Sequence, residues 1–554
     1  MLENTSGQPS RGSPSAMHSP PPAKVLGRLP LELVINVLRQ LDAPQLVRCC
    51  AVSKDIKKII DTSLALQYTI KLALAGYEDG RRVGTGRLST TAVRIERLQE
   101  HIDAWNHLNW TPESRVIVPF ASALQLAGGV FATFSGETIT FVELPSAHSW
   151  HSYTQVVVRE IESRVANVDG VQAMLFTPTL HVRNLSDNMP HAGAVEPVIH
   201  SLDDYSHDVE VSSIQIMGSL LGIVYYDPVC AYSHLEIWEW VTGRLVTELR
   251  SLSKDLYSHG ACFSSFSFLN PFFFMVPRDA GVIDIYEFSV NGVDVPPSHV
   301  ASFHLPPIRF GASGSLVVIA EPLPYDEIQP SDDPGKLFDV TGDDRMVRIH
   351  WSTWRDVHVR QNDPSNLNDL FAPYSASMER CFDIFVPLRI FREYHKFIPS
   401  TCTSTTDQPF DIPWQEWGPK NTRFTNSPTY TRNCFPRHVH GNRSVAVVHS
   451  GGTPHLVVRD YSRGRPEWMR RFPKEIAADS RVQLGIDARP LETEGGIHLE
   501  SNVWSSLPYS CSSRPLGVTL DGPFTYSVLC DDERVLFIKE IEDRPDVELI
   551  ILTM

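Results

Sequence analysis

Residues 29–60 read LPLELVINVLRQLDAPQLVRCCAVSKDIKKII, and this stretch decides how the N-terminal part of the chain folds. Apolar residues recur in it at intervals of three and four, which is the period of one face of a helix. The first series is Leu33, Val34, Val37, Leu38 and Leu41. It predicts an amphipathic helix that begins at Pro30, because the N–H that proline lacks would be unpaired in a first turn anyway.

Two more short helices are predicted directly after the first one. Asp42 offers a side-chain oxygen as the N-cap of the second helix, and Ser53 does the same for the third. Their apolar positions are Leu46, Cys49 and Cys50 in the second helix and Ile56, Ile59 and Ile60 in the third. Domains below about 40 residues rarely stand alone. We therefore expect these helices to need a partner surface.

This order of residues resembles the F-box, the helical module by which substrate receptors dock onto the Skp adaptor of SCF-type ubiquitin ligases. The opening Leu-Pro of the family is matched by Leu29-Pro30 and its Leu-Asp by Leu41-Asp42. Two positions depart from the pattern. Pro44 lies one residue later than the family's proline, and Ile56 stands where an aromatic residue is common. The alternative interpretation is an unrelated helical hairpin with a leucine stripe.

The resemblance implies which residues contact the adaptor. They are Leu29, Pro30, Glu32, Leu33, Val37, Leu38, Leu41, Asp42, Leu46 and Val52. Their apolar side chains are expected to enter a groove of the adaptor, in the helix-in-groove mode of recognition. The segment is also locally basic, and this charge would speed encounter with an acidic adaptor. The segment contains seven basic residues and only three acidic ones. The basic residues are Lys24, Arg28, Arg39, Arg48, Lys54, Lys57 and Lys58, and the acidic ones are Glu32, Asp42 and Asp55.

Composition limits the partners and the compartment. The formal net charge is −16, from 49 basic and 65 acidic residues, which argues against general nucleic-acid binding. The nine cysteines show no disulfide spacing, and no signal peptide is found, which indicates reduced thiols in the cytoplasm and/or the nucleus. No apolar run approaches the ~18 residues of a membrane span. The expected partners are the Skp adaptor, through it a cullin, and an unknown protein substrate, with no nucleic acid and no membrane.

The predicted organisation is multi-domain, a small α domain followed by a large all-β domain. Residues 1–23 are predicted to be a disordered tail, 24–76 the F-box helical domain, 77–110 a linker with a helix, and 111–554 a β-rich domain. The segments SLALQYTIKLALAG (63–76) and RIERLQEHIDAWNHLNW (94–110) resemble a large group of F-box proteins from mushroom-forming fungi. In that group the paired-Trp helix leads into a long β-rich domain.

The β-rich region is predicted to be a β-propeller of six to eight blades. Short apolar runs such as Ser213–Tyr226 indicate strands, and Leu235–Val246 resembles the last two strands of a WD-type blade. The WD markers do not recur at regular spacing, so a β-sandwich or two stacked β domains remain as alternatives. Residues 321–339 and 401–428 are interpreted as surface loop insertions because of their Pro-rich and Thr/Pro/Asn-rich composition.

The chain shows no catalytic motif. HExxH, GxSxG, a P-loop and GxGxxG in a strand–helix context do not occur. Cys434, His438 and His440 come nearest to a metal site, but a fourth ligand is lacking, which favours ordinary strand histidines. Trp238 and Trp240 share a strand face that could stack a ligand, although core packing is the commoner role. No catalytic, cofactor-binding or metal residue is predicted, and no cofactor.

The resemblance implies a non-catalytic substrate receptor, which brings a bound protein near a ubiquitin-conjugating enzyme held by other subunits. An interaction scaffold that binds partners without directing ubiquitination is the first alternative. A β-propeller hydrolase with a fused docking module is the second.

Overall fold

In a computed structural model, the chain divides into two units, residues 1–71 and 72–554. The described residues are 29–79, 90–110, 113–119, 123–127, 129–135, 138–146, 157–162, 179–182, 189–196, 198–201, 210–227, 232–252, 262–290, 295–308, 312–320, 337–342, 344–356, 377–398, 408–427, 438–464, 482–485, 489–490, 499, 503–516, 527–541 and 546–554. The predicted tail, residues 1–23, lies outside them. Among the described helices, none is both long and apolar enough to cross a membrane.

Short helices joined by almost no loop build the first unit, as predicted. They are α1 (Leu31–Leu38), α2 (Ala43–Val52), α3 (Lys54–Thr62) and the start of α4 (Leu64–Ala75). The Gln45 N–H donates to Asp42 Oδ1 at 2.7 Å and the Asp42 N–H donates to Gln45 Oε1 at 3.1 Å, a complete capping box. The Ser53 hydroxyl caps α3. The predicted caps of both helices are therefore confirmed.

The first unit is held together by a small core. Val34, Leu38, Leu46, Ile60 and Leu66 are buried in it. Packed against them are the half-buried Leu41, Cys49, Cys50, Ile56, Ile59 and Ile70. The predicted apolar positions of the second and third helices thus all contribute to this core.

The described part of the second unit holds six sheets of four or five strands, here called blades A to F, whose strands are antiparallel except for one added to blade C. Blade A is β3 (Ala123–Ala127), β4 (Val130–Ser135), β5 (Thr138–Glu143) and β6 (Val157–Glu162); blade B is β9 (Glu210–Met217), β10 (Leu220–Asp227), β11 (Tyr232–Glu239) and β12 (Arg244–Leu252). Blade C is β13 (Ser267–Asn270), β14 (Phe273–Arg278), β15 (Val282–Glu287) and β16 (Ser298–His304), to which β21 (Phe410–Ile412) adds in parallel.

The remaining blades follow in chain order. Blade D is β17 (Ala312–Ala320), β19 (Met346–Asp356), β20 (Ser377–Pro387) and β22 (Arg423–Asn426). Blade E is β23 (Val439–His440), β24 (Arg443–Ser450), β25 (Thr453–Asp460), β29 (Tyr509–Pro515) and β26 (Val482–Gly485). Blade F is β30 (Ser527–Cys530), β31 (Arg534–Glu540), β32 (Asp546–Thr553) and β2 (Ser114–Pro119).

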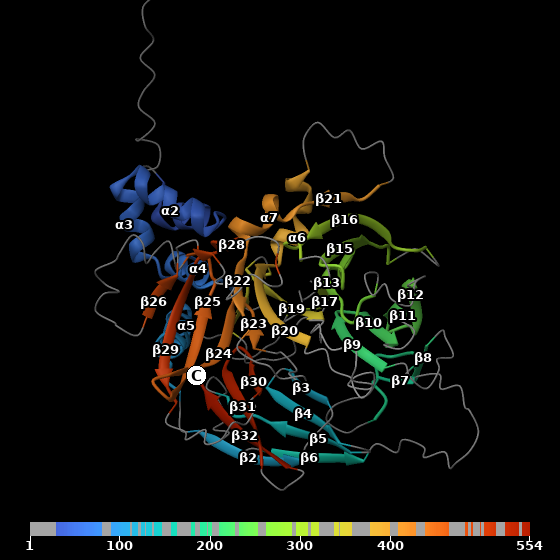
Figure 1. Cartoon of the computed structure of the whole chain (residues 1–554). Coiled ribbons are helices and arrows are strands. Elements are labelled where there is room, and N and C mark those ends of the chain that lie inside the picture. Colours follow the sequence, from blue (N-terminus) through green and yellow to red (C-terminus); the bar gives the residue numbers. More distant parts are fainter. Residues whose placement is uncertain are drawn as a thin grey trace, which may run out of the picture. The chain divides into compact units, whose positions relative to one another are not determined.

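The blades surround one centre, with the first strand of each toward it (Figure 1). Shared apolar cores join B to C, C to D, D to E, E to F and F to A. The two-stranded sheet of β7 (Thr179–His181) and β8 (Val198–His200) packs on blade B. Strand β2, which precedes every other blade strand in sequence, pairs with the final strand β32. Blade F is thus completed from both ends of the domain, and the unit is a β-propeller rather than a sandwich.

The helix predicted within the linker packs on the propeller. This helix is α5 (Thr91–His107), and its Trp105 lies in one core with strands of blades E and F. The Trp105 Nε1–H donates to the carbonyl of Asp532 at 3.0 Å, and Tyr77 Oη lies 2.7 Å from His101 Nε2. Strand β1 (Tyr77–Asp79) pairs with β18 (Phe338–Val340). Residues 72–110 therefore belong structurally to the second unit.

Two sequence interpretations are corrected. Ser213–Tyr226 is not one strand: it falls on β9 and β10, which a turn at Gly218 separates, where φ is +58°. The predicted loop at 401–428 contains β21, α7 (Trp414–Asn421) and β22 within its described part. Trp414, Trp417 and Phe424 bury this segment in the core of blades C and D, because their apolar area outweighs the polar composition around them.

The other predicted insertion is described only at its end. Residues 321–336 lie outside the described part of the chain, and β18 occupies the last residues of the predicted loop. The smaller elements of the second unit are β27 (Arg489–Pro490), which pairs with β28 (Trp504–Ser505), and the short helices α6 (Arg389–Arg392) and η5 (Tyr394–Phe397).

Candidate functional site

The first unit exposes many apolar side chains although its core is already filled. Leu29, Leu31, Leu33, Val37, Val47, Val52 and Leu64 have exposed fractions of 44 % to 78 %. On α1, Leu33 and Val37 are four residues apart and lie on one face, while Val34 and Leu38 point into the core. This helix is apolar on two sides, and only one side is used internally. An apolar surface left exposed in this way is typical of a docking site.

The structure sorts the predicted adaptor-binding residues into two groups. The exposed ones are Leu29, Pro30, Glu32, Leu33, Val37, Asp42 and Val52. Leu41 is half-buried, and Leu38 and Leu46 are only 6 % and 0 % exposed. The sequence interpretation needs correction for Leu38 and Leu46, because both side chains fill the unit's own core and cannot reach a partner while it is folded.

Leu31 and Val47 were missed by the sequence reasoning and are exposed. The signal was present in the sequence, since α1 carries more apolar residues than one helix face can hold. A single stripe at helical spacing cannot, however, show which of two apolar sides faces inward. The basic residues Arg39, Arg48, Lys54 and Lys58 are also exposed, so the positive charge of this unit lies at its surface.

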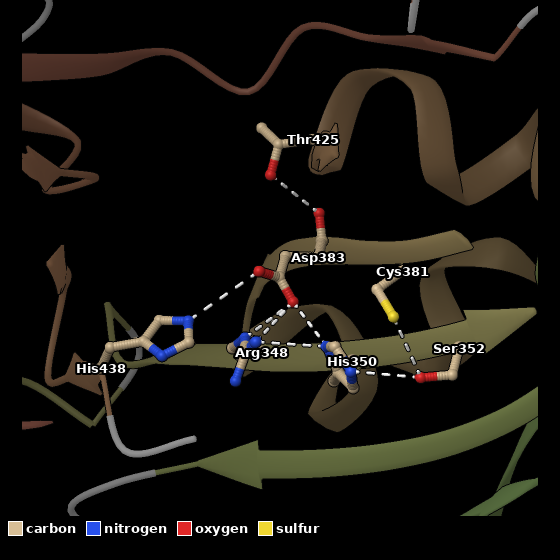
Figure 2. Close-up of polar contacts among 7 residues, drawn as sticks. All are labelled: Arg348, His350, Ser352, Cys381, Asp383, Thr425 and His438. Carbon is tan, nitrogen blue, oxygen red and sulfur yellow. Dashed lines mark hydrogen bonds and ion pairs between the residues drawn. The ribbon is translucent and has the colours of Figure 1, made fainter. Parts of the chain in front are cut away.

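The β-propeller holds a polar cluster between blades D and E whose residue types resemble those of a catalytic triad (Figure 2). Ser352 Oγ lies 3.3 Å from His350 Nε2, and His350 Nδ1 lies 2.9 Å from Asp383 Oδ1. These three residues follow the order of a nucleophile, a base and an acid. Cys381 Sγ lies 3.5 Å from Ser352 Oγ.

Arg348 makes this cluster unsuitable for a catalytic triad. Its guanidinium contacts the same Asp383 oxygen at 2.6 Å. Burial raises the pKa of Asp383, but the charge of Arg348 and the bond from His350 hold this pKa well below its usual value. The charge of Arg348 therefore compensates the negative charge of this ionised carboxylate. As a result, the carboxylate would stabilise an imidazolium only weakly. The geometry favours a structural role, in which β19, β20 and the residue before β23 are held together.

His438 belongs to this cluster. Its Nε2 lies 3.9 Å from Asp383 Oδ2. Burial, and next the charge of Arg348, lower the pKa of His438 to about 4. Cys434 lies outside the described residues, and among those that are described no three side chains are grouped to hold a metal ion.

Trp238 and Trp240 are used for packing. Trp238 lies in the core of blade B and donates its indole N–H to Glu236 Oε2 at 3.0 Å. Trp240 is half-buried against the same core and donates to the carbonyl of Gly218 at 2.8 Å. Both indole N–H groups are thus satisfied within the blade, which agrees with the expected core role.

Comparison with known proteins identifies the first helices. Residues 26–65 match the F-box domain family, so this part of the chain is an F-box domain. No curated protein matches the chain.

Solved structures that match over most of the chain include β-propellers. The WD40 β-propeller domain of Doa1 is 8 % identical, with 80 % of this chain and 96 % of that chain covered and a TM-score of 0.29. The C-terminal WD40 domain of Sif2 is 11 % identical, with 79 % and 97 % covered and a TM-score of 0.29. A chain of the S. cerevisiae complex of Dbp5 with Nup159, Gle1, IP6 and ADP is 11 % identical, with 80 % and 95 % covered and a TM-score of 0.30. The propeller fold of this chain follows from its own strand order and closing strand.

Proposed function

We propose, from the F-box domain at residues 26–65 and the β-propeller after it, that this chain is a substrate-recognition subunit of an SCF-type ubiquitin ligase. The F-box would bind the Skp adaptor and, through it, a cullin, while the propeller would bind a protein substrate. The chain would act by proximity, without a catalytic group of its own.

The observation that carries the proposal is the exposed apolar side of α1 with its neighbours. Leu29, Leu33 and Val37 lie outside a core that Val34 and Leu38 already complete. Burying such residues in a partner's groove removes apolar surface from water. This burial stabilises the complex by about 25 cal/mol for each Å² of apolar surface. We assign adaptor contact to the exposed residues Leu29, Pro30, Leu31, Glu32, Leu33, Val37, Val47 and Val52, and a structural role to Leu38 and Leu46.

We also propose that the protein acts in the cytoplasm and/or the nucleus. The six cysteines in the described part of the chain are free thiols. Free thiols suit the reducing conditions of the cytoplasm and/or the nucleus, where ubiquitin ligases would act.

The first test is co-purification of the Skp adaptor with the full chain. We expect the triple variant Leu29→Ala, Leu33→Ala and Val37→Ala to lose on the order of 100-fold in affinity, because a few anchors carry most of an interface's binding energy. The side chains are exposed, so the far-ultraviolet circular dichroism should not change. Ile117→Ala, an equally exposed apolar residue of the propeller, is the control and should bind normally. Normal binding by the folded triple variant would contradict the proposed surface.

A second test separates a receptor from a scaffold. Removal of residues 1–71 should raise the cellular level of a protein bound by the propeller if ubiquitination occurs. If its level stays constant while the adaptor still binds the full chain, the chain is a scaffold.

A further inference from the structure

Exposed apolar side chains of the second unit gather at one end of blades B and C. In the described part of this unit, six large apolar side chains are at least 55 % exposed, and five of them lie on these two blades or on the segment beside them. Each is at or near the β9–β10, β11–β12 or β13–β14 turn or the β15–β16 connection: they are Met189, Val195, Ile216, Phe272 and Val295. Strands alternate in direction within a blade, so these connections share one end.

Contacts within blade B bring the first three of these side chains together. Trp240, in the β11–β12 turn, donates its indole N–H to the carbonyl of Gly218 in the β9–β10 turn, which Ile216 precedes. The Trp240 ring meets the ring of His191 edge to face, with centroids 5.1 Å apart. The Val195 N–H donates to the carbonyl of the turn residue Val241 at 2.8 Å. The segment 189–196 therefore lies against both turns.

Blade C continues the same surface. Arg244, the first residue after the β11–β12 turn, donates to the carbonyl of Val290 in the β15–β16 connection at 2.7 Å. The Phe288 N–H donates to the carbonyl of Phe272 in the β13–β14 turn at 2.9 Å. These bonds join the ends of the two blades. The five apolar side chains together are here called the B–C surface.

Exposed carboxylates accompany the B–C surface. Glu196 lies against the β11–β12 turn and Glu287 ends β15; both are exposed, and neither has an ion-pair partner among the described residues. Basic residues near this end are already paired with carboxylates, Arg244 with Glu239 at 3.4 Å and Lys396 with Glu393 at 2.6 Å. Residues 72–554 contain 40 basic and 60 acidic residues, a formal net charge of −20. The long-range field therefore has the same sign as the local one.

We propose that the B–C surface binds the protein substrate, through a substrate segment in which lysines or arginines accompany large apolar residues. This inference rests on the receptor function proposed above. The apolar side chains of the segment would cover Val195, Ile216 and Phe272, and its cations would pair with Glu196 and Glu287. An acidic segment could cover the same apolar area but would be repelled by both carboxylates. Charge complementarity therefore selects a basic partner.

The test selects binding peptides with the full chain from a phage-displayed library of random 12-residue sequences. We expect the enriched peptides to combine a net positive charge with large apolar residues. The most enriched one is then synthesised with a fluorescent label, and its binding is measured by anisotropy. The triple variant Val195→Ser, Ile216→Ser and Phe272→Ser should bind it at least tenfold more weakly, because a few apolar anchors carry most of an interface's binding energy. Its circular dichroism should not change, since the three side chains are exposed.

The double variant Glu196→Gln and Glu287→Gln tests the charge. It should bind the peptide about threefold more weakly at low salt, and the difference should shrink as salt is added. Ile117→Ser and Glu416→Gln, at exposed positions outside the B–C surface, are the matched controls and should bind as the wild type does.

Adaptor binding separates this inference from the proposed function. The Skp adaptor should co-purify equally with the wild type and the triple variant. An adaptor that never binds contradicts the ligase function, whereas the peptide measurements decide the surface. The inference is overturned if no peptide is enriched, if enriched peptides are neutral or acidic, or if the triple variant binds them normally. Self-association of the wild type that the triple variant abolishes would assign the B–C surface to a second copy of the chain and would also overturn it.

Discussion

At the residue scale, adjacent positions have opposite roles in this chain. Val37 is 59 % exposed and Leu38 is 6 % exposed, although both are aliphatic neighbours on α1. Val37 is therefore available to a partner, and Leu38 holds the F-box together. Charge pairing also decides the role of a residue. The carboxylate of Asp383 is bound by Arg348, and for this reason the Ser-His-Asp arrangement is not a catalytic triad.

His438 makes stability depend on pH. Its pKa is about 4 in the folded protein against about 6.5 in the unfolded chain, so between these values the unfolded state binds more protons. Stability is then fully present above pH 6.5 and falls as the pH is lowered. The expected loss between pH 7 and pH 5 is about 2 kcal/mol, measured by urea unfolding at both values.

His438→Asn should flatten this pH dependence, whereas His304→Asn, at an exposed histidine, should keep it. A separate loss is expected below about pH 4, where Asp383 begins to protonate in the unfolded chain although its low folded pKa keeps it ionised in the native state. An unchanged slope in His438→Asn would show that other groups control the pH response.

At the scale of elements, strand β2 closes the propeller. It pairs with β32 from Ser114 opposite Ile551 to Pro119 opposite Asp546. Val118 points into the core shared by blades F and A and is 1 % exposed, while Ile117 points outward and is 59 % exposed. Only one face of the strand therefore packs against the core of the propeller.

Val118→Asp should destabilise the propeller by on the order of 3 kcal/mol or more, because it buries an unpaired charge. Ile117→Asp, the adjacent position on the opposite face, should change stability by less than about 1 kcal/mol. Guanidinium unfolding of the full chain measures both. Equal effects of the two substitutions would mean that β2 is not held against blade F.

At the scale of the whole molecule, the segment between the F-box and the first blade belongs to the propeller. Trp105 lies in the core with Phe537, Ile550 and Leu552, and β1 pairs with β18. Because α5 covers these strands, a domain boundary drawn at residue 110 would expose them to water.

A fragment of residues 72–554 should fold and remain soluble, whereas 111–554 should aggregate, as judged by size-exclusion chromatography and circular dichroism. Trp105→Ala within 72–554 should cost about 3–5 kcal/mol, because it opens a large cavity. A monomeric, cooperatively unfolding 111–554 fragment would contradict the role given to α5.

Much of this architecture could be predicted from the sequence, wherever the signal is local. The caps at Asp42 and Ser53 depend on a few neighbouring residues, and both were predicted correctly. The surface proposed for docking was only partly predictable. Leu38 and Leu46 were placed on it, because spacing shows that a residue is apolar without showing what covers it.

The sequence by itself determined the F-box helices, their caps and the β-rich character of the remainder, because helical period and turn residues act within a few positions. Only the tertiary structure decided which side of α1 is free, that Trp414 and Trp417 are buried, and that β2 joins β32. These outcomes depend on contacts between residues far apart in the chain. Periodicity cannot encode such contacts, since each one is selected by the packing of the whole unit.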